Sequence, residues 1–396
     1  MTFTAPRRLQ VIQTMEDLEE ALKEELIPIS RTPLYFPEHE EKGNVVIITG
    51  DGDTFSYDAV ADGDNKWVGA SSDVTKMAQR VFNTPKKVRA RVIAELAELE
   101  AQFNHAGFNN FHYLPASVEG MFNWIYINNA MAAGFNAEGK PYLYFSSMRN
   151  DNRKPEPVLV EFELRGLGGS TKNLLENIVV GRASGRWPME GKGDQLPMSL
   201  PVLVNGRQSS DAFYHAVINC SGRRTSPEAI GEYAAQSGNY VIEIPLPDDS
   251  AANPSAAYHG NVGIFYFQKK DGTRGVTYIP EMLREDARNF VYGMFSTFFG
   301  KENVYCITPE MKEVYQEGTT NLSMNVISVG LGRIISSQNH PATNRFLERE
   351  LGLEVLPVDM KAIGLGGGGL QCCYTALQHR ELEIIRAAKY VGLPEL

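Results

Sequence analysis

The chain has 396 residues, of which 43% are hydrophobic and 22% charged, an ordinary globular composition that argues against a disordered or fibrous protein. Its formal net charge is −10, whereas proteins that bind duplex nucleic acid normally carry a basic surplus. No apolar run approaches the roughly 18 residues of a membrane-spanning helix, and residues 1–10 lack the apolar core of a signal peptide. We therefore expect a cytoplasmic protein without nucleic-acid or membrane partners.

The predicted elements alternate between helices and short strands. In chain order, we expect a helix at 11–26, a strand at 44–49, a helix at 85–106, strands at 112–115, 124–127, 141–145 and 158–164, a helix at 171–180 and a strand at 216–220. There follow a helix at 226–237, strands at 240–245 and 262–267, a helix at 284–299, strands at 303–307, 325–329 and 332–336, a helix at 341–351, a strand at 353–358 and a helix at 381–391. This alternation, without a Pro/Gly/Ser-rich linker, predicts repeated α/β modules that share one core.

The four cysteines are too few and too irregularly spaced for a disulfide framework. They form no C-x-x-C pair, and the seven histidines do not combine with them at zinc-binding spacing. In a cytosolic protein such thiols are reduced. The sequence therefore predicts free cysteines and no metal site, and one of the thiols is a candidate nucleophile.

The most unusual segment is GLGGGGLQCCY at residues 364–374. Consecutive glycines permit backbone conformations closed to other residues and a close approach of the main chain to a ligand. A phosphate-binding loop would need a Gly-x-Gly-x-x-Gly or Gly-Lys-Ser/Thr context, which neither this segment nor GLGGST at 166–171 supplies. The glycines could instead deliver the thiol of Cys372 into a cleft, or Cys372 and Cys373 could simply be buried after a flexible turn.

A nucleophilic thiol needs an acid/base group and a carboxylate that orients it. His259 opens an apolar stretch in YHGNV, Glu190 lies in MEGKGD, and Asn128 and Asn129 follow the apolar WIYI. Each also has a structural interpretation: a partly exposed histidine, an exposed loop glutamate and a pair of turn-capping asparagines. The residues alone leave both interpretations open.

Taken in order, these segments resemble the guanidino-group-modifying superfamily, which has the pentein fold. GGGGLQC is similar to that superfamily's Gly-Gly-Gly-x-x-Cys pattern and implies Cys372 as the nucleophile, with Cys373 as its neighbour. YHGNV resembles a His-x-Asp/Asn motif and implies that His259 is the general acid/base. MEGKGD resembles a Glu-Gly-x-x motif and implies that Glu190 orients the histidine or contacts the substrate.

The same resemblance implies the substrate-binding residues. The pair Asn128 and Asn129 would meet the substrate together with Asn261, and Arg224, in the segment RRT, would bind a substrate carboxylate. Deiminases of this superfamily have aspartates where this chain has Asn129 and Asn261, which is similar to the dihydrolase branch, such as succinylarginine dihydrolase. Because an amide both donates and accepts hydrogen bonds, asparagine suits a neutral ureido group as well as a cation.

The resemblance covers roughly residues 95–380, and residues 1–90 match the first module only loosely. It implies an α/β propeller of repeated ββαβ modules, a single domain over residues 1–396. The implied activity is a cysteine-dependent hydrolase that releases ammonia from a small guanidino or ureido compound through a covalent cysteine adduct, without a metal or cofactor. An amidinotransferase and a non-catalytic binding protein are the alternatives. A homo-oligomer is compatible with the sequence.

Overall fold

The computed structural model describes residues 10–33, 45–49, 85–114, 126–167, 172–247, 259–365 and 368–385. Within these residues, five small sheets share one pattern: their first two strands are antiparallel, and the third runs parallel to the second. The five are β5 (Met131–Phe135), β6 (Pro141–Phe145) and β7 (Val179–Arg182); β8 (Gln195–Leu196), β11 (Ala216–Ser221) and β12 (Tyr240–Pro245); β13 (Ile264–Gln268), β14 (Arg274–Tyr278) and β15 (Val304–Cys306); β16 (Ile327–Ser328), β17 (Arg333–Ser337) and β18 (Glu354–Val358); and β19 (Tyr374–Leu377), β3 (Val45–Thr49) and β4 (Phe111–Leu114).

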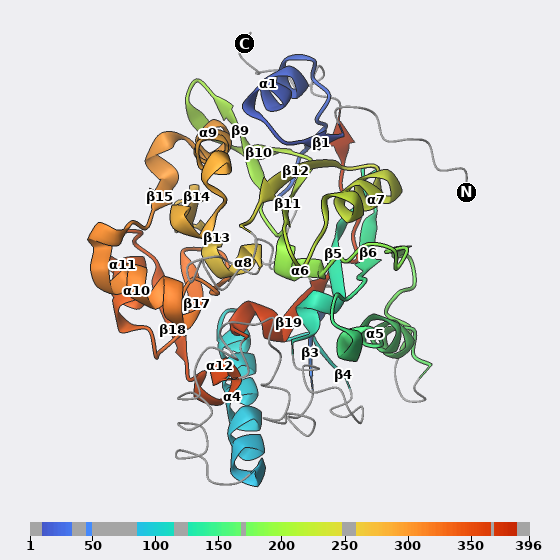
Figure 1. Cartoon of the computed structure of the whole chain (residues 1–396), viewed down its shortest axis with the longest axis vertical. Coiled ribbons are helices and arrows are strands. Elements are labelled where there is room, and N and C mark those ends of the chain that lie inside the picture. The colour runs from blue at the N-terminus through green and yellow to red at the C-terminus, as the bar shows by residue number, and fades with distance from the viewer. Residues whose placement is uncertain are drawn as a thin grey trace.

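Each parallel pair of strands is joined by a helix, as parallel crossovers usually are because they need a long connection. In the order of the sheets above, these helices are α5 (Glu156–Leu164), α7 (Pro227–Ser237), α9 (Arg288–Phe299), α11 (Pro341–Arg349) and α4 (Pro85–His105). Figure 1 shows these helices toward the outside of the molecule, around the strands. The repeated ββαβ unit confirms the predicted α/β architecture.

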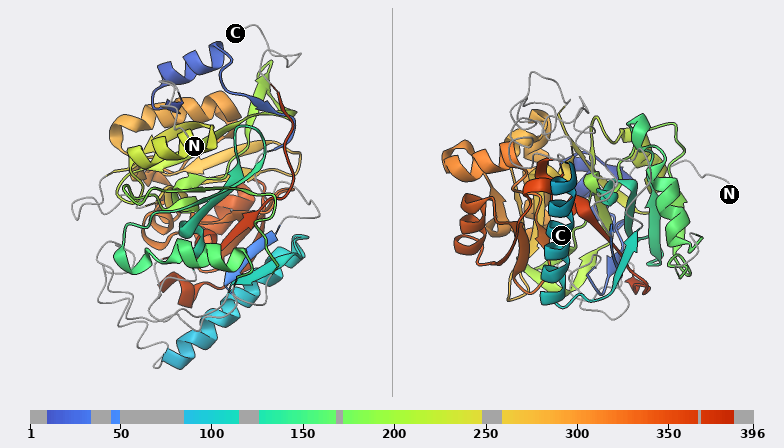
Figure 2. Two further views of the ribbon diagram at one scale, coloured as in Figure 1. Left: turned by 90° about the vertical axis from the view of Figure 1, so that its right-hand side faces the viewer. Right: turned by 90° about the horizontal axis from the view of Figure 1, so that it is seen from below.

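Segments from the two halves of the sequence close the arrangement. In the fifth sheet, β19 pairs with β3, so that Tyr374 lies opposite Ile48. A further sheet contains β20 (Ile384–Ile385), β2 (Ile29–Ser30), β10 (Arg207–Tyr214) and β9 (Leu200–Val204), and β1 (Val11–Ile12) extends the β12 edge. Helices α1 (Met15–Lys23) and α4 lie at opposite ends of the molecule (Figure 2). Two further helices are α10 (Lys312–Asn321) and the short α12 (Lys361–Leu365).

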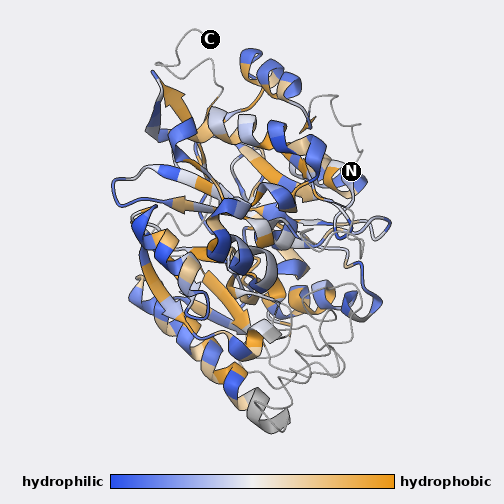
Figure 3. Cartoon of the chain, turned by 60° about the vertical axis from the view of Figure 1, so that its left-hand side comes forward, coloured by the Kyte–Doolittle hydropathy of each residue, from blue (hydrophilic) through white to orange (hydrophobic). Residues whose placement is uncertain are grey.

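The apolar core follows the inner strands. Figure 3 shows hydrophobic residues along these strands and hydrophilic residues on the outward faces of the helices. One buried cluster contains Val92, Leu96 and Phe103 of α4 together with Cys372 and Cys373. The long helix α4 therefore supports the segment that carries the candidate nucleophile.

Helix α7 has the boundaries that the sequence predicts. Ser226 is its N-cap and accepts a hydrogen bond from the Ala229 amide at 3.2 Å, Pro227 occupies the first turn, and Gly238 ends the helix with a φ of +74°. The local sequence specifies both ends of α7, so that its bounds can be predicted from periodicity and capping residues alone.

We expect the substitution S226A to lower the free energy of unfolding by about 1 kcal/mol, because the Ala229 amide loses its acceptor at the start of the helix. Urea denaturation followed by circular dichroism measures this change. A loss below about 0.3 kcal/mol would contradict a capping contribution of the usual size.

Two predictions of element type, at 158–164 and 171–180, are wrong, and two more, at 124–127 and 381–391, are wrong in their described parts. Residues 158–164, predicted as a strand because of their branched and aromatic side chains, belong to helix α5. Pro157 in the first turn favours this helix start, and Val158 and Phe162, one turn apart, are 69% and 44% exposed. Apolar residues on the solvent side hide the polar outer face by which an amphipathic helix is recognised. The predicted helix at 171–180 is also wrong: its described part forms turns that lead into β7.

Other predictions differ in their boundaries. The predicted helix at 11–26 is shortened to α1, because Val11 and Ile12 form β1. The predicted strand at 124–127 is wrong in its described part, because Tyr126 lies outside any strand and Ile127 begins the 3-10 helix η2; residues 124–125 lie outside the described residues. The predicted helix at 381–391 is wrong in its described part, which is extended and contains β20; residues 386–391 lie outside the described residues. Residues 168–171 of GLGGST and the glycines at 366–367 also lie outside them.

Candidate active site

Short helical turns lead into the first strands of four of the five sheets in the described part of the chain. These turns are η2 (Ile127–Ala130) before β5, α6 (Gly191–Asp194) before β8, α8 (Gly260–Gly263) before β13 and η8 (Leu370–Cys373) before β19. Turn α6 contacts both η2 and α8, and η2 contacts η8. Figure 1 shows α6, α8 and β19 near the centre of the molecule. The modules therefore meet at their entry turns, which contain or adjoin most of the predicted site residues.

Cys372 lies in η8 and is 5% exposed. Its thiol lies 3.9 Å from Oδ1 of Asn325, the residue that leads into β16. Burial raises the pKa of Cys372, while the backbone of Gly369 and the charge of Arg153 act in the opposite direction. The thiol is thus buried, but beside a cation that favours its thiolate form.

Gly369, three residues before Cys372, is a position at which the fold requires glycine. A Cβ on Gly369 would collide with the amide oxygen of Asn325. That oxygen also accepts a hydrogen bond from the Gln371 amide at 2.8 Å, while Nδ2 of Asn325 donates to the Asn261 carbonyl at 3.1 Å. Asn325 therefore fixes the cysteine turn and links it to α8.

Cys373 has a different environment from its neighbour. It is fully buried, and its sulfur contacts the Gly369 carbonyl at 3.5 Å. Burial raises the pKa of Cys373 well above its usual value, and the charges of Cys372 and Glu95 act in the same direction. Cys373 therefore packs in the apolar cluster with the character of an inert thiol.

His259 immediately precedes α8 and is 2% exposed, so that the partly exposed interpretation is wrong. Its Nδ1 lies 3.1 Å from Oδ2 of Asp194, and its Nε2 lies 3.3 Å from Oε2 of Glu190 and 3.1 Å from Nδ2 of Asn129. Burial alone would lower the pKa of His259, but the carboxylates of Asp194 and Glu190 raise it above its usual value. The two carboxylates therefore favour the imidazolium form of His259.

Glu190 is fully buried, so that the exposed-loop interpretation is also wrong. Its Oε1 lies 3.3 Å from Nη1 of Arg224 and accepts a hydrogen bond from the Arg149 amide at 3.2 Å. Burial alone would raise the pKa of Glu190, but Arg224, His259 and Arg153 hold it well below its usual range. The carboxylate stays ionised beside His259.

The three predicted asparagines are buried at the same centre. Nδ2 of Asn129 reaches toward both Nε2 of His259 and Oε2 of Glu190, the latter at 3.5 Å. The Asn128 side chain interacts with Cys372 and lowers the pKa of that thiol. Within the described residues, both amide atoms of Asn261 are buried without a hydrogen-bond partner.

Sequence reasoning missed several residues of this centre. Asp194 and Lys192 were within the quoted segment MEGKGD but were not singled out, and both are buried in α6. Thr225 donates to Oδ2 of Asp194 at 2.6 Å and accepts from the Glu190 amide at 3.0 Å. Arg153 makes a bidentate pair with Glu156, at 2.8 and 2.7 Å. The i,i+3 spacing of this pair was visible in the sequence, whereas its burial was not.

Residues 195–215, the segment between Asp194 and β11, belong to two different sheets. They begin with β8 of the second sheet and continue with β9 and β10 of the further sheet, in which β10 pairs with both β9 and β2. Asp194 immediately precedes β8.

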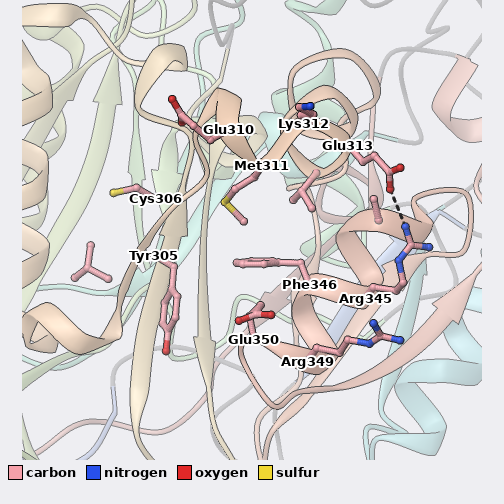
Figure 4. Close-up of a pocket in the computed structure, with 13 residues that line it drawn as sticks. Tyr305, Cys306, Glu310, Met311, Lys312, Glu313, Arg345, Phe346, Arg349 and Glu350 are labelled. Carbon is pink, nitrogen blue, oxygen red and sulfur yellow. Dashed lines mark hydrogen bonds and ion pairs between the residues drawn. The ribbon is translucent and has the colours of Figure 1, made fainter.

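A groove of about 760 Å³ lies elsewhere, between β15, α10 and α11 (Figure 4). It contains Cys306, Phe346 and charged residues of both signs, among them Arg345, which forms an ion pair with Glu313 at 2.9 Å. Burial raises the pKa of Cys306. None of the predicted site residues lines this groove.

Two findings concern the described residues as a whole. No helix among them is both long and apolar enough to cross a membrane. They also contain no group of three or more His, Cys, Asp or Glu side chains arranged to hold a metal ion.

No protein-family model and no curated protein matches the chain. Among solved structures, it is similar to the product-bound N-terminal domain of ArgZ, described as an arginine dihydrolase from the ornithine–ammonia cycle in cyanobacteria: the TM-score is 0.59 at 14% identity, over 85% of this chain and 98% of that chain. A dimethylarginine dimethylaminohydrolase matches with a TM-score of 0.51 at 13% identity, over 84% and 98% of the two chains. AgrE, in complex with ornithine and NAD+, matches with a TM-score of 0.58 at 14% identity, over 85% of this chain and 39% of the AgrE chain. The chain therefore has the pentein fold of these structures, at low sequence identity.

Proposed function

We propose that this protein is a cysteine-dependent hydrolase of the C–N bonds of an arginine-like guanidino or ureido compound. The observation that carries the proposal is that the entry turns of separate modules bring together Cys372, a histidine between two carboxylates, and buried asparagines. This is the set of groups that covalent catalysis at a planar carbon requires: a nucleophile, an acid/base and polar groups that fix the substrate.

In the first half-reaction, the Cys372 thiolate attacks the central carbon of the guanidino group and forms a C–S bond. His259 protonates the departing nitrogen from Nε2, the C–N bond breaks, and ammonia leaves. The Asp194 carboxylate next to Nδ1 and the ionised Glu190 next to Nε2 support the imidazolium that this step needs.

In the second half-reaction, neutral His259 takes a proton from water, and the hydroxide attacks the same carbon. The tetrahedral adduct then expels the Cys372 thiolate, and the product is a ureido compound. A dihydrolase repeats both half-reactions on the ureido product and releases a second ammonia, carbon dioxide and an amine.

The amides suit a substrate that passes from cation to neutral molecule. Asn261 has both its donor and its acceptor free within the described residues, and Asn129 lies beside the acid/base pair. The carboxylate of Glu190 faces Arg224 and His259, so that the site does not offer the pair of unengaged carboxylates that would clamp a cation alone. This charge balance favours a dihydrolase over a deiminase, and Arg224 adds a buried cation for a substrate carboxylate.

The test is incubation of the purified protein with L-arginine, an N-acylated arginine, a methylated arginine and citrulline, each labelled with ¹³C at the guanidino or ureido carbon. Two ammonia molecules per substrate and ¹³C in carbon dioxide identify a dihydrolase. One ammonia and ¹³C in a ureido product identify a deiminase.

Two other outcomes distinguish the alternatives. Absence of ammonia, with ¹³C transferred to an added primary amine, identifies an amidinotransferase. If none of the compounds is consumed and none adds mass to Cys372, the hydrolase proposal is wrong and a binding protein is favoured.

A further inference from the structure

The fourth sheet brings one side chain to the candidate site, although no short helical turn precedes its first strand in the described part of the chain. Helix α10 ends at Asn321, and Leu322 follows it with a φ of +58°. The amide of Asn325 then donates to the Leu322 carbonyl at 3.0 Å, and β16 begins two residues later. This tight turn buries Asn325 at the place in its module that the entry turns occupy in the other four.

The side-chain amide of Asn325 joins three modules at this point. Its Oδ1 accepts a hydrogen bond from the Gln371 amide at 2.8 Å and lies 3.9 Å from Sγ of Cys372, where a thiol S–H can donate to it. Its Nδ2 donates to the Asn261 carbonyl at 3.1 Å. A carboxamide oxygen has two lone pairs, so that it can hold the backbone of the cysteine turn and the thiol at the same time.

Among side chains of this size, asparagine alone serves both neighbours. Leucine would remove the partner that the Gln371 amide and the Asn261 carbonyl have here, and aspartate would turn an oxygen toward that carbonyl. The space for the amide depends on Gly369, because a Cβ at residue 369 would collide with Oδ1 of Asn325. The asparagine of one module and the glycine of another are therefore matched to each other.

We propose that Asn325 is a positioning residue of the nucleophile: it accepts the S–H of the resting Cys372 thiol and, through the Asn261 carbonyl, fixes the sulfur relative to α8. His259 immediately precedes α8, so that the same link sets the place of the nucleophile relative to the acid/base. A displacement of about 1 Å at a reacting atom can cost about a hundredfold in rate. The inference rests on the proposed function in one respect, the choice of Cys372 as the nucleophile.

The first measurement contains no substrate. The S–H stretching band of Cys372 is obtained as the infrared difference between C373S and C372S/C373S, and is measured again with N325L added to both proteins. We expect a narrow band in the parent, at a lower frequency than in N325L, because a thiol that donates to one oxygen has a weakened S–H bond and a single orientation. N325D keeps an acceptor oxygen and should keep the band at the lower frequency.

The second measurement is the single-turnover rate of adduct formation with a compound that the protein consumes. We expect N325L to lower this rate about 10- to 100-fold and to leave KM within about threefold, because the nucleophile is displaced while the substrate contacts remain. N239A is the matched control: Asn239 is also buried, and its amide donates to the Phe135 carbonyl at 2.8 Å and lies 3.1 Å from Nε2 of His215. Unfolding midpoints are measured for each variant, and N325A replaces N325L if the latter melts early.

The proposal is overturned if N325L leaves the S–H band at the parent frequency, or if it slows adduct formation no more than N239A does. Turnover together with an unshifted band would reject the Asn325 inference and leave the proposed function standing. If no compound is consumed, the infrared band alone decides: a shift in N325L supports the contact although the proposed function fails, and no shift rejects both.

Discussion

Replacement of Cys372 by serine is expected to lower kcat for ammonia release by at least about a thousandfold, because a hydroxyl at this position would have no comparable means of forming the covalent adduct. The turn itself should survive, since its hydrogen bonds from the Cys372 and Gln371 amides to Gly369 and Asn325 involve the backbone of residues 371–372. Steady-state ammonia release measures the loss. Intact mass spectrometry after rapid acid quenching should show substrate-derived mass in the parent protein and none in the variant.

C373S is the matched control, because it makes the same chemical change one residue away. Cys373 is fully buried with a pKa raised well above its usual value, so that its replacement should cost stability but leave kcat within about threefold of the parent. Activity retained in C372S, or lost in C373S with a normal unfolding midpoint, would show that the nucleophile is assigned to the wrong cysteine.

Replacement of His259 by asparagine is expected to lower kcat by about 10²–10⁴-fold, the usual contribution of a general acid/base. Loss of the acid should slow formation of the adduct, and loss of the base should slow its hydrolysis. Pre-steady-state ammonia release and adduct mass measure the two steps separately. H215N is the control for removal of a buried histidine, because His215 is hydrogen-bonded to the Asn136 carbonyl and to Asn239 rather than to the site.

The pH dependence has a defined sign. His259 acts as an imidazolium, and its pKa is raised above the usual 6.5, so that kcat should fall as pH rises through a value above 6.5. D194N removes a carboxylate that raises this pKa and should move the alkaline limb to lower pH. An alkaline limb that D194N leaves in place would contradict the role of His259 as the acid.

The segments of the candidate site could be found from the sequence because each joins a local signal to an unusual residue. Four consecutive glycines before Cys372, and a polar pair before an apolar strand at His259, are visible without knowledge of the fold. Helix α7 was predicted with its ends because Ser226, Pro227 and Gly238 act within one turn of the boundary. Interactions between residues close in the sequence determine these features, so that no knowledge of the fold is needed to find them.

The burial of the site could not be predicted in the same way. MEGKGD contains charges and glycines, which are typical of a solvated loop, yet Glu190, Lys192 and Asp194 are all buried. Their burial arises because turns from distant modules meet, and the cations that neutralise Glu190 come from Arg153 and Arg224. For the same reason Lys192 had no signal of its own: it contacts Tyr374, which belongs to a different module.

The pairing of β19 with β3 has a consequence for how the protein becomes active. A ribosome delivers residues 45–114 long before residues 372–377, so that β3 and β4 must wait for the strand that completes their sheet. Contacts between such distant segments form slowly, because a large loop of chain has to close first. The cysteine turn leads directly into that late strand, so that the sheet that holds Cys372 in place is completed only after nearly all of the chain has been synthesised.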